Sequence, residues 1–220
     1  MDGTDHNAMV GVGNSAHYNT ATGSQNPLIN EAGEYELLKK NARQNAKMEL
    51  WIPNTVSPMA TFTSASNATG FISFKINAYT DDYIYMQFVD TGANSGADRW
   101  TANGCIMDPF FNVSKPNASG EVTVTGWDNL ILKSATVGDD KFTGWFDVKI
   151  AIELSSQNDT ITLHYYVDGV YLGAASKELT TSSNAINSVY ILGYCKAKDS
   201  GIKLDDISFC CSNSGWTLGE

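Results

Sequence analysis

Aromatic and polar side chains alternate with apolar ones in the second half of the chain, and this alternation marks the residues suited to ligand chemistry. Residues 145–154 read Trp-Phe-Asp-Val-Lys-Ile-Ala-Ile-Glu-Leu, and residues 160–167 read Thr-Ile-Thr-Leu-His-Tyr-Tyr-Val. Successive side chains of a β-strand point to opposite faces, so each run has one apolar and one polar face. The polar face is richer in rings than an ordinary solvent-facing surface, and we interpret it as a candidate binding surface.

The candidate residues share the polar parity of their strands and carry a ring. Flat aromatic rings match the C–H faces of sugars, while amide, carboxylate and imidazole groups orient hydroxyls in pockets of mixed polarity. The pattern therefore favours a carbohydrate-binding surface, although stacked structural tyrosines are the alternative because Tyr has a high strand propensity everywhere. The set is Tyr83, Tyr85, Trp145, His164, Tyr166, Tyr190 and Tyr194.

Two tryptophans stand next to turn-rich segments rather than inside the alternating runs. Trp100 follows the loop-like residues 91–98, and Trp127 lies between the short runs 121–125 and 129–133. Each is suited either to a sugar platform at the rim of a sheet or to an anchor that holds a loop. We include both among the candidate carbohydrate-binding residues.

The elements that position these residues are predicted to be strands almost throughout. Period-two alternation with one apolar face indicates antiparallel strands with one buried side. Residues 90–120 are expected to be a long loop, residues 1–33 a loop-rich start and residues 212–220 a tail. We predict an all-β fold, a two-sheet antiparallel β-sandwich (jelly roll), as one domain spanning 1–220. The clearest runs are 47–52, 70–78, 82–89, 121–125, 129–133, 145–154, 160–172, 188–194 and 203–209.

Composition excludes several classes of partner. The net charge is -10, and the only arginines are Arg43 and Arg99, so the basic footprint of a nucleic-acid binder is missing. No run approaches the ~20 apolar residues of a membrane span, which predicts no membrane insertion. The start of the chain has no signal-peptide pattern. The low charged fraction of 17% favours a secreted or cell-surface parent protein over a cytoplasmic one.

Three runs near the end of the chain carry a family resemblance: Leu-His-Tyr-Tyr-Val-Asp-Gly-Val-Tyr at 163–171, Ser-Val-Tyr-Ile-Leu-Gly at 188–193 and Leu-Asp-Asp-Ile-Ser-Phe at 204–209. In this order they resemble the second half of the jelly rolls of the concanavalin A-like lectin/glucanase superfamily, which includes laminin-G-like domains and carbohydrate-binding modules. The resemblance covers about the last third of the chain well and the remainder only by strand pattern. Fold alone does not establish function.

The resemblance implies glycan binding on a concave sheet or on its edge loops, and in many members a structural calcium. Calcium needs several oxygen ligands, and in related jelly rolls an Asp of the closing strand helps to fix the fold. Asp206 is therefore the first candidate for a metal ligand, with hydrogen bonds to loop amides as the alternative role.

Catalysis is the less favoured expectation. The glucanase branch carries Glu-x-Asp-x-x-Glu, which is missing here, and the arginine-rich lyase motif is missing too. Asp147 and Glu153 share a strand face but stand about 20 Å apart along an extended strand, too far to act on one glycosidic bond. A degenerate polysaccharide lyase or glycanase remains an alternative.

We expect a non-catalytic carbohydrate-binding module, monomeric and part of a larger secreted or surface protein, whose partner is a polysaccharide or glycan. A laminin-G-like protein-binding adhesion domain that uses its loops is the competing class. The pairing of Cys105, Cys195, Cys210 and Cys211 stays open, because four cysteines allow three connectivities.

Overall fold

The structure is a computed structural model that describes residues 28–29, 33–38, 46–53, 68–80, 83–89, 109–137, 143–155, 160–178, 188–195 and 201–212. Within these ranges the chain forms two antiparallel sheets, which confirms the predicted two-sheet β-sandwich. The predicted loop-rich start (1–33) and tail (212–220) lie almost entirely outside the described residues, as does Trp100.

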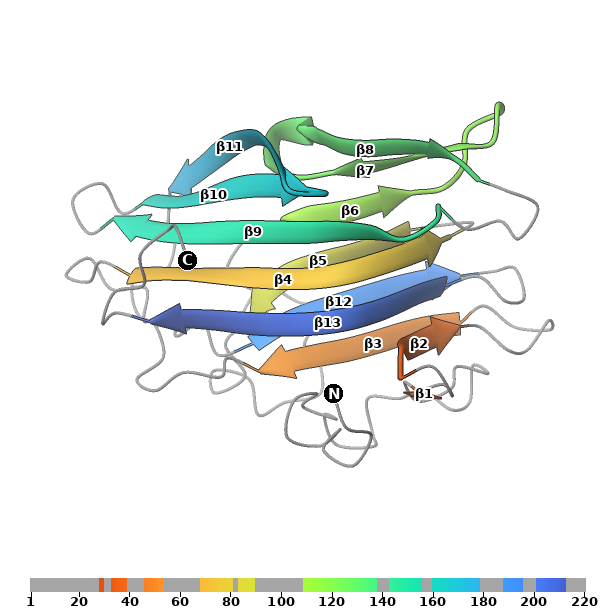
Figure 1. The fold of residues 1–220 in the computed structure, drawn as a ribbon, viewed down its shortest axis with the longest axis horizontal. Helices are drawn as coiled ribbons and strands as arrows, with labels where there is room; N and C mark the ends of the chain where they lie inside the picture. Colours follow the sequence, from red (N-terminus) through yellow and green to blue (C-terminus); the bar gives the residue numbers. More distant parts are fainter. Residues whose placement is uncertain are drawn as a thin grey trace.

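The strands of the two sheets are drawn in Figure 1. The seven-stranded sheet has the order β1 (Leu28–Ile29), β2 (Tyr35–Leu38), β13 (Gly201–Ser212), β4 (Ala68–Tyr79), β9 (Phe146–Ser155), β10 (Thr160–Val167) and β11 (Val170–Glu178). The six-stranded sheet has the order β3 (Ala46–Pro53), β12 (Ser188–Cys195), β5 (Tyr83–Val89), β6 (Phe111–Ser114), β7 (Glu121–Thr125) and β8 (Ile131–Thr136). The 3-10 turn η3 (Trp127–Asn129) connects β7 to β8.

The core lies between the inner faces of the two sheets, as the alternation predicts. Along β9 and β10 the residues of the apolar parity are buried, and those of the polar parity are half-buried or exposed, apart from Ala151, which is buried. Burial of such side chains contributes roughly 1.5–3 kcal/mol each for the larger ones. The two strands therefore pack against the core through one face only, and their other face points away from the sandwich.

One predicted loop contains a strand. Residues 109–120 belong to the stretch expected to be irregular, yet Phe111–Ser114 pairs with β5 as strand β6. Phe110 and Phe111 are both fully buried, and the Phe110 ring stacks on Phe88 with centroids 4.3 Å apart. The strand was missed because four residues are too few to show a clear period.

Tyr165 joins the two sheets through the core. Its hydroxyl donates to the Phe110 carbonyl (2.9 Å) and accepts from the Trp127 backbone N–H (3.0 Å). A Cβ at Gly126 would lie 2.6 Å from the Tyr165 ring, so only glycine fits beside it. A strand of the seven-stranded sheet is thus held against the turn that follows β7 in the six-stranded sheet.

Candidate functional site

The outer face of the seven-stranded sheet gathers charged and aromatic side chains from adjacent strands. Lys75 on β4 lies opposite Asp147 on β9 and opposite Asp205 on β13. One step along the strands, Lys149 on β9 lies between Ser73 on β4 and Tyr166 on β10. Neighbouring pairs of this kind have Cβ atoms about 4.5–5.5 Å apart, so these side chains form one continuous surface.

A groove of about 520 Å³ crosses this surface. Its lining combines two lysines, two aspartates and a serine with one tyrosine ring, which is the mixture of hydrogen-bonding groups and apolar wall that suits a small polar ligand. The groove spans strands that are far apart in the sequence, so no single run reveals it. It is lined by Ser73, Phe74, Lys75, Asp147, Val148, Lys149, Tyr166, Gly169 and Asp206.

Asp206 faces this groove and forms an ion pair with Lys75. The hydrogen bond and charge of Asp206, with smaller contributions from Asp147 and Asp205, raise the pKa of Lys75 above its ordinary value of 10.5. The Lys75 ammonium therefore already neutralises the Asp206 carboxylate through Oδ2. Within the described residues, no group of three His, Cys, Asp or Glu side chains is placed to hold a metal ion. The described residues around Asp206 therefore do not supply the six to eight oxygen ligands that calcium takes.

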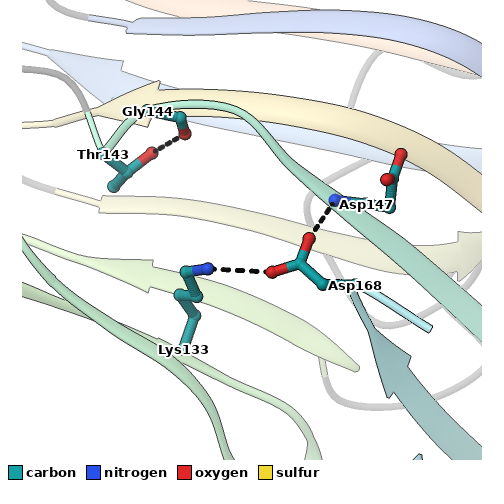
Figure 2. A network of polar contacts seen from close by, with 5 residues as sticks. All are labelled: Lys133, Thr143, Gly144, Asp147 and Asp168. Carbon is teal, nitrogen blue, oxygen red and sulfur yellow. Dashed lines mark hydrogen bonds and ion pairs between the residues drawn. The ribbon is translucent and has the colours of Figure 1, made fainter. Parts of the chain in front are cut away.

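The Tyr-Val-Asp-Gly turn closes one side of the groove. Asp168 and Gly169 both have positive φ angles, 50° and 77°, which the two central residues of a type I′ hairpin turn require. Figure 2 shows the Asp168 carboxylate between Lys133 and Asp147. It accepts from the Asp147 backbone N–H (3.0 Å) and from Lys133 Nζ (2.9 Å).

Asp168 therefore has a structural role that connects three strands. Burial is the largest single influence and raises the pKa of Asp168, but the hydrogen bonds from the Asp147 amide and from Lys133, together with the Lys133 charge, outweigh it and lower the pKa below its ordinary value of 3.8. Because Lys133 lies on β8 of the six-stranded sheet, the ion pair also links the two sheets. Of the two central residues of the turn, Asp168 and Gly169, it is Gly169 that lines the groove.

His164 lies farther along the same face, beside two titratable neighbours. Its Nε2 is 3.3 Å from Glu153 Oε2, and its Nδ1 is 3.4 Å from the Tyr171 hydroxyl. Nε2 is buried and makes no hydrogen bond within the described residues, so Glu153 is a close neighbour of this nitrogen rather than its hydrogen-bond partner. The Tyr171 ring also packs against Tyr166, with centroids 5.1 Å apart. This cluster fixes the position of Tyr166 at the wall of the groove.

Trp145 lies at the other end of this face. It directly precedes β9, has the outward parity of Asp147, and is 42% exposed. Residues of one parity repeat every ~7 Å along a strand, so the indole stands one step from the groove. The structure thus brings Trp145, His164 and Tyr166 onto one sheet face.

The other predicted residues lie on the opposite side of the sandwich. Tyr83 and Tyr85 belong to β5 of the six-stranded sheet, and their rings stack with centroids 5.7 Å apart. Tyr190 and Tyr194 belong to the adjacent β12, opposite Gln87 and Tyr83 respectively. The seven candidates therefore lie on two sheets rather than on one concave sheet, because strand parity separates inside from outside but does not say which sheet a strand joins.

Trp127 is a core residue. It is only 2% exposed, and Lys177 Nζ lies 5.3 Å from its ring centroid. Its predicted role as an exposed sugar platform is wrong, because the turn after β7 folds inward to meet Tyr165. Trp127 instead anchors the turn between β7 and β8 in the core, which was the alternative role.

Several groove residues were not among the predicted ligand-binding residues. The alternation places Asp147 and Lys149 on the polar face, but only the ring-bearing residues of that face were predicted to bind a ligand. Lys75 and Ser73 have the outward parity of β4, and that parity was the available signal. Tyr171 follows the Asp-Gly turn, and only the irregular pairing of β10 and β11 sets it beside Tyr166.

Comparison with known proteins adds a likeness of general fold. No family model and no curated protein sequence matches the chain. Among solved structures, the Lotus tetragonolobus seed lectin is similar at 12% identity and a TM-score of 0.47, over 86% of this chain and 92% of that one. The carbohydrate recognition domain of Emp47p is similar at 16% identity and a TM-score of 0.46, over 86% and 95%.

A third similar structure is the metal-free form of lectin I-B4 from Griffonia simplicifolia, at 12% identity and a TM-score of 0.41 over 86% of this chain and 91% of that one. These structures belong to the group that the resemblance in the sequence named. The likeness concerns the arrangement of strands alone, and the site must be argued from this chain's own residues.

Proposed function

We propose that the chain is a non-catalytic carbohydrate-binding module that holds a glycan in the groove on the outer face of its seven-stranded sheet. The observation that carries the proposal is the lining of that groove. Tyr166 offers an aromatic wall, Asp147 and Asp206 offer acceptors, and the lysines offer donors, all on neighbouring strands of one sheet. Sugar hydroxyls need both kinds of partner together with an apolar surface.

Two further observations favour this face over the opposite one. Trp145 is 42% exposed and has the outward parity of the groove residue Asp147, so an exposed indole lies on this sheet face. On the six-stranded sheet, Gln87 has the outward parity but is only 7% exposed, so that face is closed at this point. We also propose that this module is part of a larger secreted or cell-surface protein. The low charged fraction of the chain, 17%, supports this part of the proposal.

The test is a screen of the chain against a glycan array and soluble polysaccharides, with Tyr166→Ala and Tyr83→Ala beside the parent. Loss of the Tyr166 ring is expected to weaken binding about 10-fold or more, since ring stacking and cavity walls contribute on the order of 1–3 kcal/mol. Tyr83→Ala removes an equal ring from the opposite sheet and is the matched control, expected to bind like the parent.

The same samples decide between binding and catalysis. We expect no new reducing ends and no unsaturated products after prolonged incubation with any polysaccharide that binds. Binding that survives Tyr166→Ala but not Tyr83→Ala would move the site to the six-stranded sheet. A parent chain that binds no glycan would reject the proposal and leave protein-binding adhesion as the better hypothesis.

A further inference from the structure

Strand β13 contains one residue more than its partner β4 beside the groove. Asp205 pairs with Lys75 and Ser208 pairs with Ser73, so Asp206 and Ile207 together oppose the single residue Phe74. This is a β-bulge, which adds a residue to one strand and re-aims the local side chains. Bulges concentrate next to binding and active sites.

The bulge brings no benefit to the core. Leu204 and Ile207 are both buried on either side of it, as they would be in a regular strand one residue shorter. Asp206 itself has a φ of 50°, a left-handed conformation that is unfavourable for residues other than glycine, although Asp and Asn tolerate it best. The only product of the extra residue is a second, consecutive carboxylate on the outer face.

The two consecutive carboxylates have different surroundings. Asp205 Oδ1 accepts from the Asp206 backbone N–H (2.9 Å), so Asp205 stabilises the bulge, and it does not line the groove. Asp206 lines the groove, and its side chain is 63% exposed. Among the residues that the structure describes, only Lys75 contacts the Asp206 carboxylate, through Oδ2. Oδ1 is therefore available to a ligand.

The formal charges of the residues that line the groove cancel. Lys75 and Lys149 carry two positive charges, and Asp147 and Asp206 carry two negative charges. A ligand with a net charge of either sign would therefore meet repulsion as well as attraction. A neutral hydroxyl meets no such conflict, since it is able to donate to Asp206 while it accepts from Lys75.

We propose that Asp206 is the specificity-determining residue of this groove and selects a neutral sugar by a free hydroxyl that donates to its carboxylate and accepts from Lys75. The β-bulge orients the Asp206 side chain toward the ligand, and the ion pair with Lys75 holds the carboxylate in place before the ligand binds. Substitution of that hydroxyl, for example by O-methylation, removes the donor and leaves the charged acceptor unpaired. The inference rests on the proposed carbohydrate binding.

The test compares Asp206→Asn with Asp205→Asn in the full 220-residue chain. Both variants remove one negative charge from adjacent positions of one strand, and Asn tolerates the left-handed conformation. The probes are hydroxyethyl cellulose, galactomannan and xylan, each before and after O-methylation, and retardation in affinity gels reports the dissociation constant. Asp206→Gly is measured alongside, because glycine accepts the φ of 50° and keeps the strand folded.

The parent is expected to bind at least one unmethylated probe and to lose that binding on O-methylation. Asp206→Asn and Asp206→Gly are expected to weaken binding at least about 10-fold, because hydrogen bonds to a charged acceptor are the strong ones. Asp205→Asn is expected to stay within about 2-fold of the parent.

Equal binding by the parent and both Asp206 variants would overturn the role of Asp206 while leaving the carbohydrate-binding proposal intact. Equal weakening by Asp205→Asn would overturn it as well, since a general charge effect would then explain the loss. A parent that binds none of the probes and no glycan of the array would reject the proposed function itself, and this inference with it.

Discussion

Tyr165 belongs to the seven-stranded sheet, but its hydroxyl satisfies two backbone groups of the segments that flank β6 and β7. The residue is fully buried, and its ring lies against Gly126. Burial removes water from the phenol and raises the pKa of Tyr165 well above its ordinary value of 10.0. The neutral hydroxyl is thus the form that the folded protein requires.

Replacing Tyr165 by Phe is expected to destabilise the protein by about 1–3 kcal/mol at pH 7, because the Phe110 carbonyl and the Trp127 N–H lose their partner in the core. The variant also changes the response to alkali. A group whose pKa is raised on folding contributes stability below its unfolded pKa, and this contribution is lost as the pH rises above about 10.

Urea denaturation between pH 7 and pH 11 checks both expectations. The free energy of unfolding should fall more steeply above pH 10 for the parent than for Tyr165→Phe, so the two curves approach each other. Parallel curves would show that the phenol already ionises in the folded state and that the core around it admits water.

At the scale of elements, two β-bulges stand at opposite ends of one row across the seven-stranded sheet. The β13 bulge contains Asp206, and the pairing of β10 with β11 skips Leu172 between Tyr165 and Tyr166. Bulges bend a strand and increase its local twist. The groove lies between them, lined by Tyr166 near one bulge and Asp206 at the other.

Deletion of single residues in β13 distinguishes the bulge from the regular ladder. Removing Asp206 closes the bulge and keeps Leu204, Ile207 and Phe209 facing the core, so the free energy of unfolding should stay within about 1 kcal/mol of the parent. Removing Ser208 turns Phe209 and Cys211 to the outer face. That loss should exceed about 4 kcal/mol, since removing a buried Phe side chain from a core, with the cavity that it leaves, costs about 3–5 kcal/mol.

Chemical denaturation of the two deletion variants gives both values. If deletion of Asp206 destabilises the protein as much as deletion of Ser208, the bulge supports the fold rather than the groove. The Asp206 deletion should also bind glycans no better than Asp206→Gly, because it removes the same carboxylate.

At the scale of the whole molecule, strands from the two ends of the described sequence meet in the middle of one sheet. The last strand, β13, lies between β2 and β4 (Figure 1) and contributes Ile202, Leu204, Ile207 and Phe209 to the core. The sheet that carries the groove is therefore complete only when the C-terminal strand is in place.

A chain that ends at residue 200 is expected not to fold, because β2 and β4 would face each other across an empty strand position with an exposed core. Near-ultraviolet circular dichroism and urea titration should show no native aromatic signal and no cooperative transition. A cooperative unfolding transition whose free energy falls with urea as steeply as that of the parent would mean that β13 only docks on a sheet already formed.

Among the described residues, no helix is long and apolar enough to cross a bilayer.

The sequence alone determined which side of each strand faces the core, because side-chain alternation is local and depends on neither partner strands nor loops. That is why the sandwich, the buried parity of β9 and β10 and the Asp-Gly hairpin were predictable. The change of parity at Leu204-Asp-Asp-Ile207 was also visible in the sequence, as two polar residues between buried ones.

Only the tertiary structure decided which outward faces belong together. Tyr83 and Tyr166 have the same outward parity, yet one lies on the six-stranded sheet and the other on the seven-stranded sheet. Lys75, Lys149 and Asp206 come from three strands distant in the sequence and meet at one groove. Strand order depends on long-range pairing and core packing, and a pattern of period two contains no information about either.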